Sequence, residues 1–251
     1  ILTNSQFTKF NKIFSEKTKV IDCTFDVSSS LKERIEKIKE ECEIAVREGS
    51  SALILSDKDI SDKKTSIPSA LAVGAAHSHL VKNGLRGYCS LNVECSDALD
   101  THSFAVLIGV GATTINPYLA IDSIYQRFEK KLFGKSDFES CVIKFKKSID
   151  SGLLKIMSKM GISVISSYRG GCNFEAVGLS RAIVSDYFPG MSSRISGIGI
   201  SGIEDKIKEL HRKFSKKNIH TLPIGGLYRY RKSGENHQYD GSLIHSLQSA
   251  V

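Results

Sequence analysis

Three histidines are the first residues in this sequence whose type could do chemistry. His77, His79 and His102 carry imidazoles that could bind a metal ion. His77 and His79, however, are two residues apart on an expected helix, so their side chains point about 200° apart and cannot easily share a metal. Histidines on a helix surface or at an interface are the simpler interpretation.

A serine flanked by lysines is a second candidate. Ser158 lies between Lys155 and Lys159 and could suggest a Ser–Lys nucleophile. Such a serine requires a base within hydrogen-bond reach and a nearby oxyanion hole, and the sequence supplies neither clearly.

A glycine-rich segment, residues 196–202, could hold a phosphate. Its glycines expose backbone N–H groups just before an expected helix. It matches neither the P-loop nor the dinucleotide fingerprint, and no strand precedes it. A flexible linker is therefore the favoured interpretation.

The run Tyr168-Arg169-Gly170-Gly171 is the candidate with the most informative position. It follows an expected fifth strand, and ligands of α/β proteins bind at the carboxyl ends of parallel strands. We expect Arg169 to make charge-assisted hydrogen bonds there to a carboxylate or to backbone carbonyls. Arg169 and Glu175 are the best functional candidates, and an ion pair that orders the loop is the structural alternative.

Alternating patterns of strand and helix must position these residues. Helical spacing of apolar residues and short β-rich runs predict βα units with right-handed crossovers. The fold class is therefore α/β, with a parallel sheet or a partial, degenerate TIM-like barrel. Expected strands are Val20–Phe25, Ala52–Leu55, Tyr88–Glu94, Ala112–Ile115 and Ile162–Ser166. Expected helices are Ser30–Glu48, Pro68–Gly84, His102–Ile108, Leu119–Leu132, Phe138–Met157 and a short turn at Phe174–Val177.

The alternating strand and helix pattern of the sequence ends after Pro189. Residues 1–190 are predicted to form the α/β domain, and residues 191–251 a linker and helical extension. The chain begins at Ile1, and the apolar stripe of Leu243, Leu247 and Val251 runs to its end. These ends are those expected of a fragment of a longer polypeptide.

Composition excludes several classes of protein. The longest apolar stretch, Phe104–Val110, is too short to span a membrane, and no signal peptide opens the chain. Six scattered cysteines are expected to be reduced and buried, which predicts an intracellular compartment, cytoplasmic or plastid. The net charge is +8, and its excess lies after residue 125. Because no RNA-binding motif accompanies this charge, nucleic-acid binding is not expected.

The segment from Asp150 to Leu179 resembles a known family. The runs Asp150–Ser163, Ser167–Gly170 and Phe174–Leu179 look like the signature of the central domain of glutamate synthase. The similarity extends in order over nearly the whole chain and includes Ala52–Asp57, Ile67–Ala75, Ile115–Ala120, Gly225–Gly226 and His237. Departures from the family pattern are Leu99, Ser103, Cys172-Asn173 and Gly241.

This resemblance implies a part of a large oxidoreductase that makes two L-glutamate from L-glutamine, 2-oxoglutarate and a reductant. The parent enzyme carries FMN and an iron–sulfur cluster, with FAD and NAD(P)H on a partner or a further domain in some forms. The implied partners are the glutaminase and FMN synthase domains of the same polypeptide, joined by an ammonia tunnel. No nucleic acid and no membrane is implied.

For this chain the resemblance implies a scaffold. It transfers no catalytic, cofactor-binding or metal-binding residue, and it implies that an earlier central-domain segment near FMN is missing. The structural or inter-domain candidates are Arg169, Glu175, Tyr168 and His102. Two alternatives remain at this point: a free-standing flavin- or phosphate-binding barrel-like enzyme, and a basic nucleic-acid-binding module.

Overall fold

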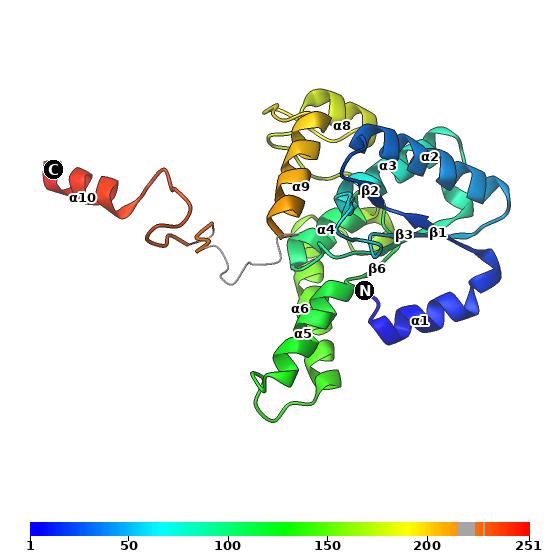
Figure 1. Ribbon diagram of the computed structural model, residues 1–251, viewed down its shortest axis with the longest axis horizontal. Helices are drawn as coiled ribbons and strands as arrows, with labels where there is room; N and C mark the ends of the chain where they lie inside the picture. The colour runs from blue at the N-terminus through cyan, green and yellow to red at the C-terminus, as the bar shows by residue number, and fades with distance from the viewer. Residues whose placement is uncertain (215–223, 228) are drawn as a thin grey trace. The chain divides into compact units, whose positions relative to one another are not determined.

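The computed structural model describes residues 1–214, 224–227 and 229–251 (Figure 1). The chain divides into two compact units, Ile1–His211 and Arg212–Val251. The strands are β1 (Thr18–Asp22), β2 (Thr24–Asp26), β3 (Ala52–Ser56), β4 (Lys64–Ser66), β5 (Ser90–Glu94) and β6 (Thr114–Asn116). The helices are α1 (Asn4–Ile13), η1 (Ser15–Lys17), α2 (Leu31–Arg47), α3 (Ser69–Lys82), η2 (Arg86–Tyr88), α4 (Thr101–Gly109), α5 (Tyr118–Glu129), α6 (Phe138–Lys159), α7 (Ile165–Tyr168), α8 (Arg181–Tyr187), α9 (Ile200–Phe214) and α10 (Gly241–Ala250).

Four parallel strands form the main sheet, in the order β1-β3-β5-β6. Each crossover passes through one helix and steps in the same direction along the sheet, as in part of a barrel. The register aligns Ile21, Leu55, Val93 and Ile115 in one row. The α/β class with a parallel sheet is thus confirmed. The short strands β2 and β4 pair antiparallel in a separate sheet.

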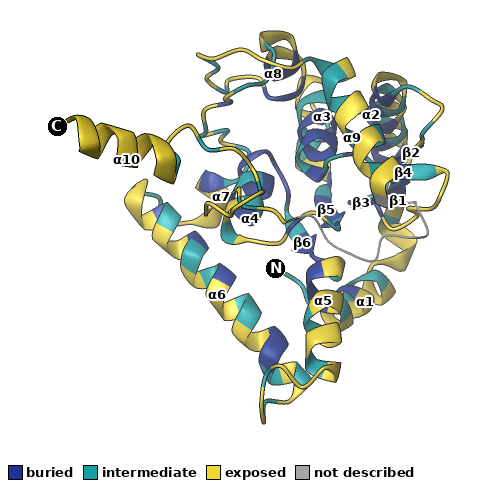
Figure 2. Cartoon of the chain, turned by 60° about the vertical axis from the view of Figure 1, so that its left-hand side comes forward, coloured by how far each residue is buried: buried dark blue, intermediate teal, exposed yellow. Residues whose placement is uncertain are grey.

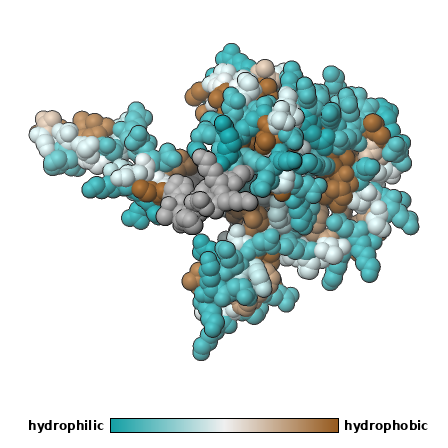
Figure 3. Space-filling model, viewed as in Figure 1, coloured by the Kyte–Doolittle hydropathy of each residue, from teal (hydrophilic) through white to brown (hydrophobic). Residues whose placement is uncertain are grey.

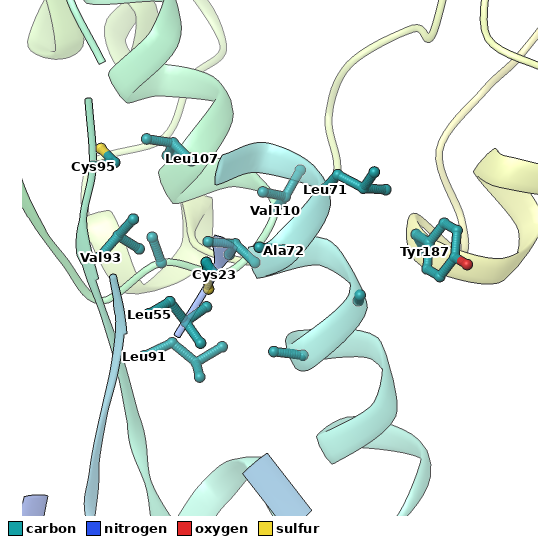
Figure 4. Packing of buried hydrophobic residues seen from close by; sticks show 14 of the residues in the cluster. Cys23, Leu55, Leu71, Ala72, Leu91, Val93, Cys95, Leu107, Val110 and Tyr187 are labelled. Atoms are coloured by element: carbon teal, nitrogen blue, oxygen red, sulfur yellow. The ribbon is translucent and has the colours of Figure 1, made fainter. Parts of the chain in front are cut away.

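The core lies between the main sheet and helices α2, α3 and α4. Figure 4 shows Leu55, Leu91 and Val93 of the strands facing Ala72 of α3, and all four side chains are buried. In α2 the apolar side chains that recur every three or four positions are buried (Leu31, Ile35, Ile38, Cys42 and Ala45), while the other face, which includes Ile44, is exposed (Figure 2). Burial of each such side chain contributes about 1.5–3 kcal/mol relative to exposure. The outer surface seen in Figure 3 is correspondingly mostly hydrophilic.

The opposite face of the sheet carries polar side chains beside the buried Ile54. Asn92, fully buried, donates from Nδ2 to the Leu53 carbonyl (3.2 Å) and accepts from the Thr114 hydroxyl (2.7 Å). Leu2 donates its N–H to the Ile115 carbonyl (2.9 Å), so the chain enters α1 at the carboxyl end of β6. Because η1 then leads into the start of β1, α1 connects opposite ends of the sheet.

Two expected elements are wrong. Ile162–Ser166 is not a strand, because Ile165–Tyr168 forms the short helix α7. Phe174–Val177 is not helical, because Glu175 pairs as an isolated parallel bridge with Ser192. Both predictions rested on short runs of β-branched or apolar residues, in which propensity is a weak signal that tertiary contacts override.

The segment interpreted as a flexible linker belongs to the first unit. Ile198 donates its N–H to the Gly178 carbonyl (3.0 Å) and accepts from the Ser180 N–H (2.9 Å). A Cβ at Gly197 would overlap the backbone of Gly178, so the two segments lie in close contact. The linker interpretation of this segment is therefore wrong. The boundary near residue 190 stays a prediction about the longer polypeptide.

In the second unit, Asp240 caps α10 by accepting from the Leu243 N–H (2.8 Å). Before it, Gly225 accepts from the Glu235 N–H (2.9 Å). Within the described ranges, no helix combines the length and the hydropathy needed to cross a membrane.

Candidate functional site

The run from Tyr168 to Cys172 contacts the end of α4. Gly170 donates its N–H to the Ile108 carbonyl (3.1 Å), and Cys172 donates to the Gly109 carbonyl (3.0 Å). Since α4 runs antiparallel to the strands that it connects, its last turn lies at the amino ends of those strands. The prediction that this run closes the carboxyl end of a strand is therefore wrong. In barrel enzymes the active site is built at the carboxyl ends of the strands and not at this edge.

Tyr168 anchors this run in the core. Its side chain is 1% exposed, and its hydroxyl donates to the Ala105 carbonyl (3.2 Å). Its ring packs edge-to-face against Phe174, with centroids 6.1 Å apart. Burial raises the pKa of the phenol, so it stays protonated. The hydroxyl thus acts as a structural donor.

Arg169 does not make the hydrogen bonds expected of it. Its Nε atom is buried and has no hydrogen-bond partner among the described residues. Glu175 instead faces Arg194, with Oε1 3.6 Å from Nε, and the Arg194 side chain is 84% exposed. Both the expected pairing of Arg169 and the alternative Arg169–Glu175 ion pair are wrong. The surface pair of Glu175 and Arg194 contributes little stability.

The three candidate histidines do not share a contact partner. His77 accepts at Nδ1 from Arg86 Nε (3.1 Å), and His79 Nε2 lies 2.6 Å from Glu43 Oε2. His102 is exposed in the first turn of α4. No group of three metal-ligating side chains occurs in the part of the chain that the structure describes. The site roles of His102, Tyr168, Arg169 and Glu175 stay predictions.

A row of polar side chains that sequence reasoning missed ends the sheet at its carboxyl edge. The register aligns Asp22, Ser56, Glu94 and Asn116 across β1, β3, β5 and β6. Ser56 Oγ donates to Glu94 Oε2 (2.7 Å), and Lys58 Nζ donates to Glu94 Oε1 (2.9 Å). The available signal was a polar residue at the end of each strand, but only the register shows that these residues are neighbours.

The ends of this row are also paired. Asp22 Oδ1 accepts from the N–H (2.8 Å) and the hydroxyl (2.7 Å) of Thr24, and Oδ2 lies 3.2 Å from Lys64 Nζ. Asn116 Nδ2 donates to the Leu2 carbonyl (3.1 Å) and to Asn4 Oδ1 (3.0 Å). The polar side chains of this row therefore form their hydrogen bonds and ion pairs within the fold.

Asp57, directly after β3, is the most buried carboxylate of this edge, at 3% exposure. Oδ2 accepts from the N–H (2.9 Å) and the hydroxyl (2.6 Å) of Ser96. Oδ1 accepts no well-aligned hydrogen bond from the described residues, although the Tyr118 hydroxyl is close enough to lower the pKa. Burial outweighs these contacts and raises the pKa of Asp57.

The cysteines do not fit an iron–sulfur cluster. Cys23, Cys42, Cys89 and Cys95 are buried, and burial raises the pKa of each thiol, to about 12 for Cys42. A cluster is held by cysteine thiolates, and burial disfavours the thiolate form of these four side chains.

The glycine-rich segment does not fit the phosphate of a flavin. The Ile198 N–H already donates to the Gly178 carbonyl (3.0 Å), and Gly197 lies against the backbone of Gly178. Ser158, Lys155 and Lys159 are exposed on α6. These residues therefore supply no cofactor cradle and no enclosed nucleophile.

Comparison with known proteins identifies the family. Residues 1–180 match the model of the glutamate synthase central domain. The whole chain is 50% identical to part of the glutamate synthase [NADPH] large chain of Azospirillum brasilense and 40% identical to part of that of Bacillus subtilis. Over 90% of the chain, the ferredoxin-dependent glutamate synthase of Pyropia yezoensis is 37% identical.

The aligned segment is 17% of the Azospirillum brasilense protein and 16% of each of the other two, so this chain spans about a sixth of their length. The match runs through every element of the sheet and through the Tyr168–Cys172 segment. The chain belongs to the glutamate synthase central domain family.

Proposed function

We propose that this chain serves as the central domain of a glutamate synthase, which forms two L-glutamate from L-glutamine, 2-oxoglutarate and a reductant. In this role it is a scaffold between a glutaminase domain and an FMN synthase domain, and it helps to shape the route of ammonia between them. The observation that carries the proposal is 50% identity, over the full chain, to one segment of a glutamate synthase large chain.

The side-chain contacts support a scaffold over a catalyst. Barrel enzymes react at the carboxyl ends of their strands, where catalytic side chains must be free to meet a substrate. Here Glu94 and Asp22 at that edge are held by Lys58, Lys64 and Thr24. FMN and the iron–sulfur cluster, and FAD and NAD(P)H where they are used, then belong to other parts of the enzyme. We place the enzyme in the cytoplasm or a plastid, with no nucleic-acid or membrane partner.

A chimeric enzyme tests the proposal. The matching segment of the Azospirillum brasilense large chain is replaced by this chain, and glutamate formation is measured with glutamine and, separately, with added ammonia. We expect both activities to be retained, because a scaffold of the same family preserves the position of the flanking domains.

The control is the wild-type large chain prepared in the same way, with FMN absorbance and elution volume as checks on folding. A chimera that folds and uses added ammonia but not glutamine would contradict the proposed part in the ammonia route. A chimera that loses FMN would contradict the scaffold role itself.

A further inference from the structure

The second unit, Arg212–Val251, has no apolar core among its described residues. No residue in it is buried where the structure describes its exposure, and the side chains of Ile224, Leu227, Tyr230 and Tyr239 are exposed. A short segment that buries no apolar side chain cannot offset the conformational entropy that it loses on folding. The second unit therefore requires a surface outside itself.

Helix α10 of this unit presents an apolar face without a partner. Leu243, Ile244 and Leu247 lie on one side of the helix and are 41%, 43% and 54% exposed. Figure 2 shows α10 exposed along its whole length. An isolated helix of 10 residues is marginal in water, because most helical stability in proteins comes from packing of the apolar face. A partner surface would supply that packing.

The composition of α10 is that of an interface. It contains no Asp, Glu, Lys or Arg, although charged residues make up 25% of the chain. Helix α9 shows the usual pattern of a surface helix: Ile203 and Ile207 pack against the core of the first unit, and Asp205 and Lys206 between them are exposed. Because the cores of protein interfaces are depleted of charged residues, the uncharged helix α10 is suited to being covered by protein.

The size of this face indicates which kind of partner it fits. A helix of 10 residues is about 15 Å long and about 10 Å wide, so one face of it covers on the order of 150 Å². A stable interface between separate proteins buries about 800 Å² on each partner, so α10 alone is too small to hold two free copies together. A partner in the same polypeptide requires far less area, because the covalent connection raises its effective concentration.

The relatives of this chain contain such a partner. The match to the Azospirillum brasilense large chain covers 100% of this chain, the second unit included, but 17% of that large chain. The central-domain family model matches residues 1–180, which lie within the first unit. Helix α10 is therefore shared with the large chain but lies outside the segment that the central-domain model matches.

We propose that the face of α10 formed by Leu243, Ile244 and Leu247 docks into an uncharged apolar groove on a flanking domain of the same polypeptide, an inference that rests on the scaffold function proposed above. Docking buries the three side chains and supplies the packing that α10 lacks. It is the helix-in-groove mode of recognition, in which residues three and four positions apart act as anchors. The contact is one by which the scaffold holds a flanking domain in place.

Amide hydrogen exchange of residues 241–250 tests this proposal, in the isolated chain and in the chimeric large chain. In the isolated chain we expect exchange near the rate of an unstructured peptide at every protein concentration. In the chimera we expect exchange at least a hundredfold slower, because docking holds the helix closed. Fast exchange in the chimera would overturn the proposal. Slow exchange in the isolated chain would also overturn it, and a concentration dependence would then identify a second copy as the partner.

Two variants of the chimera make the test specific. Leu247→Ser removes the central anchor and should speed the exchange of α10 at least tenfold. It should also speed exchange in a segment of the glutaminase or the FMN synthase domain, which identifies the domain that carries the groove. His245→Ser makes a change to the same residue type on the opposite side of α10 and should leave exchange within twofold of wild type. Equal acceleration by both variants, or no change in either flanking domain, would contradict the docking.

Glutamate formation, measured on the same samples, separates this proposal from the scaffold function. A chimera that forms glutamate from glutamine but exchanges the α10 amides rapidly contradicts the docking of α10 alone. A chimera in which α10 exchanges slowly but glutamine is not used supports the docking and contradicts the proposed part in the ammonia route.

Discussion

Replacement of Gly74 by alanine sets two physical effects against each other. Gly74 lies in the middle of α3, where α8 packs against it. A Cβ at this position would overlap the Phe188 ring, lying 2.7 Å from Cδ1, and would lie 2.8 Å from the Tyr187 carbonyl oxygen. Phe188 is 6% exposed, and the Tyr187 oxygen belongs to the backbone, so neither can turn aside into solvent. We expect Gly74→Ala to force α8 away from α3.

The net effect follows from two magnitudes. Alanine in a helix interior is more favourable than glycine by about 1 kcal/mol. Overpacking of a filled core costs about 1–3 kcal/mol, and a clash with backbone falls at the upper end of that range. We therefore expect Gly74→Ala to lower the free energy of unfolding of the first unit by about 1–2 kcal/mol. For a unit of this size, that loss lowers Tm by roughly 2–8 °C.

Urea and thermal unfolding, followed by circular dichroism, measure this change. Gly87→Ala is the control, because nothing lies within 4 Å of a Cβ at Gly87 and no positive φ is required there. The control should stay within about 0.5 kcal/mol of wild type. A Gly74→Ala chain as stable as wild type, or more stable, would show that helix propensity dominates and that α8 does not pack as described.

Further predictions concern the docking of α9, acid stability, cofactor content and nucleic acids. Glu204→Gln weakens the hydrogen bond that Glu204 Oε2 accepts from the Leu31 N–H (2.9 Å), and it should lower the free energy of unfolding in urea by about 1 kcal/mol. Glu33→Gln, on the exposed face of α2, is the control and should lower it by less. Burial lowers the pKa of His77 from 6.5 to about 4, so between these pH values the ring stays neutral in the folded chain but takes up a proton in the unfolded chain. The free energy of unfolding should therefore fall as the pH drops from 6.5 to 4, and His77→Gln should reduce that slope. An NMR titration of the His77 ring with a midpoint near 6.5 would refute the reasoning. The purified chain should be colourless and lack glutaminase and glutamate-forming activity, and stoichiometric flavin absorbance would contradict this. Binding to unrelated DNA and RNA should be weak at low salt and vanish at physiological salt, because only counterion release would drive it; sequence-selective binding in gel-shift titrations at physiological salt would contradict the scaffold role.

The candidate site shows how far sequence reasoning reached. The spacing of His77 and His79 predicted separate partners, and the structure gives them Arg86 and Glu43. The predicted position of Arg169 was wrong because it depended on an expected strand at Ile162–Ser166, where the structure has the helix α7. When that strand is absent, the following residues are no longer placed at a carboxyl edge, and their contacts with α4 decide their location.

The polar row at the carboxyl edge illustrates a different limit. Each of Asp22, Glu94 and Asn116 ends a strand and could be noted individually in the sequence. Their alignment depends on the register between strands that are tens of residues apart, and a shift of one residue would turn each side chain to the other face. The alignment of these side chains therefore cannot be predicted from any short segment of the sequence.

The sequence by itself determined the α/β class, most of the strands and helices of the sheet, and the family, because periodic apolar residues and a specific signature are local properties. The tertiary structure alone decided which edge of the sheet holds Tyr168–Cys172, and that Arg86 donates to the Cys89 and Gly111 carbonyls. The physical reason is sequence separation: the Tyr168 hydroxyl bonds to a carbonyl 63 residues away, and such contacts arise only when packing has fixed both segments.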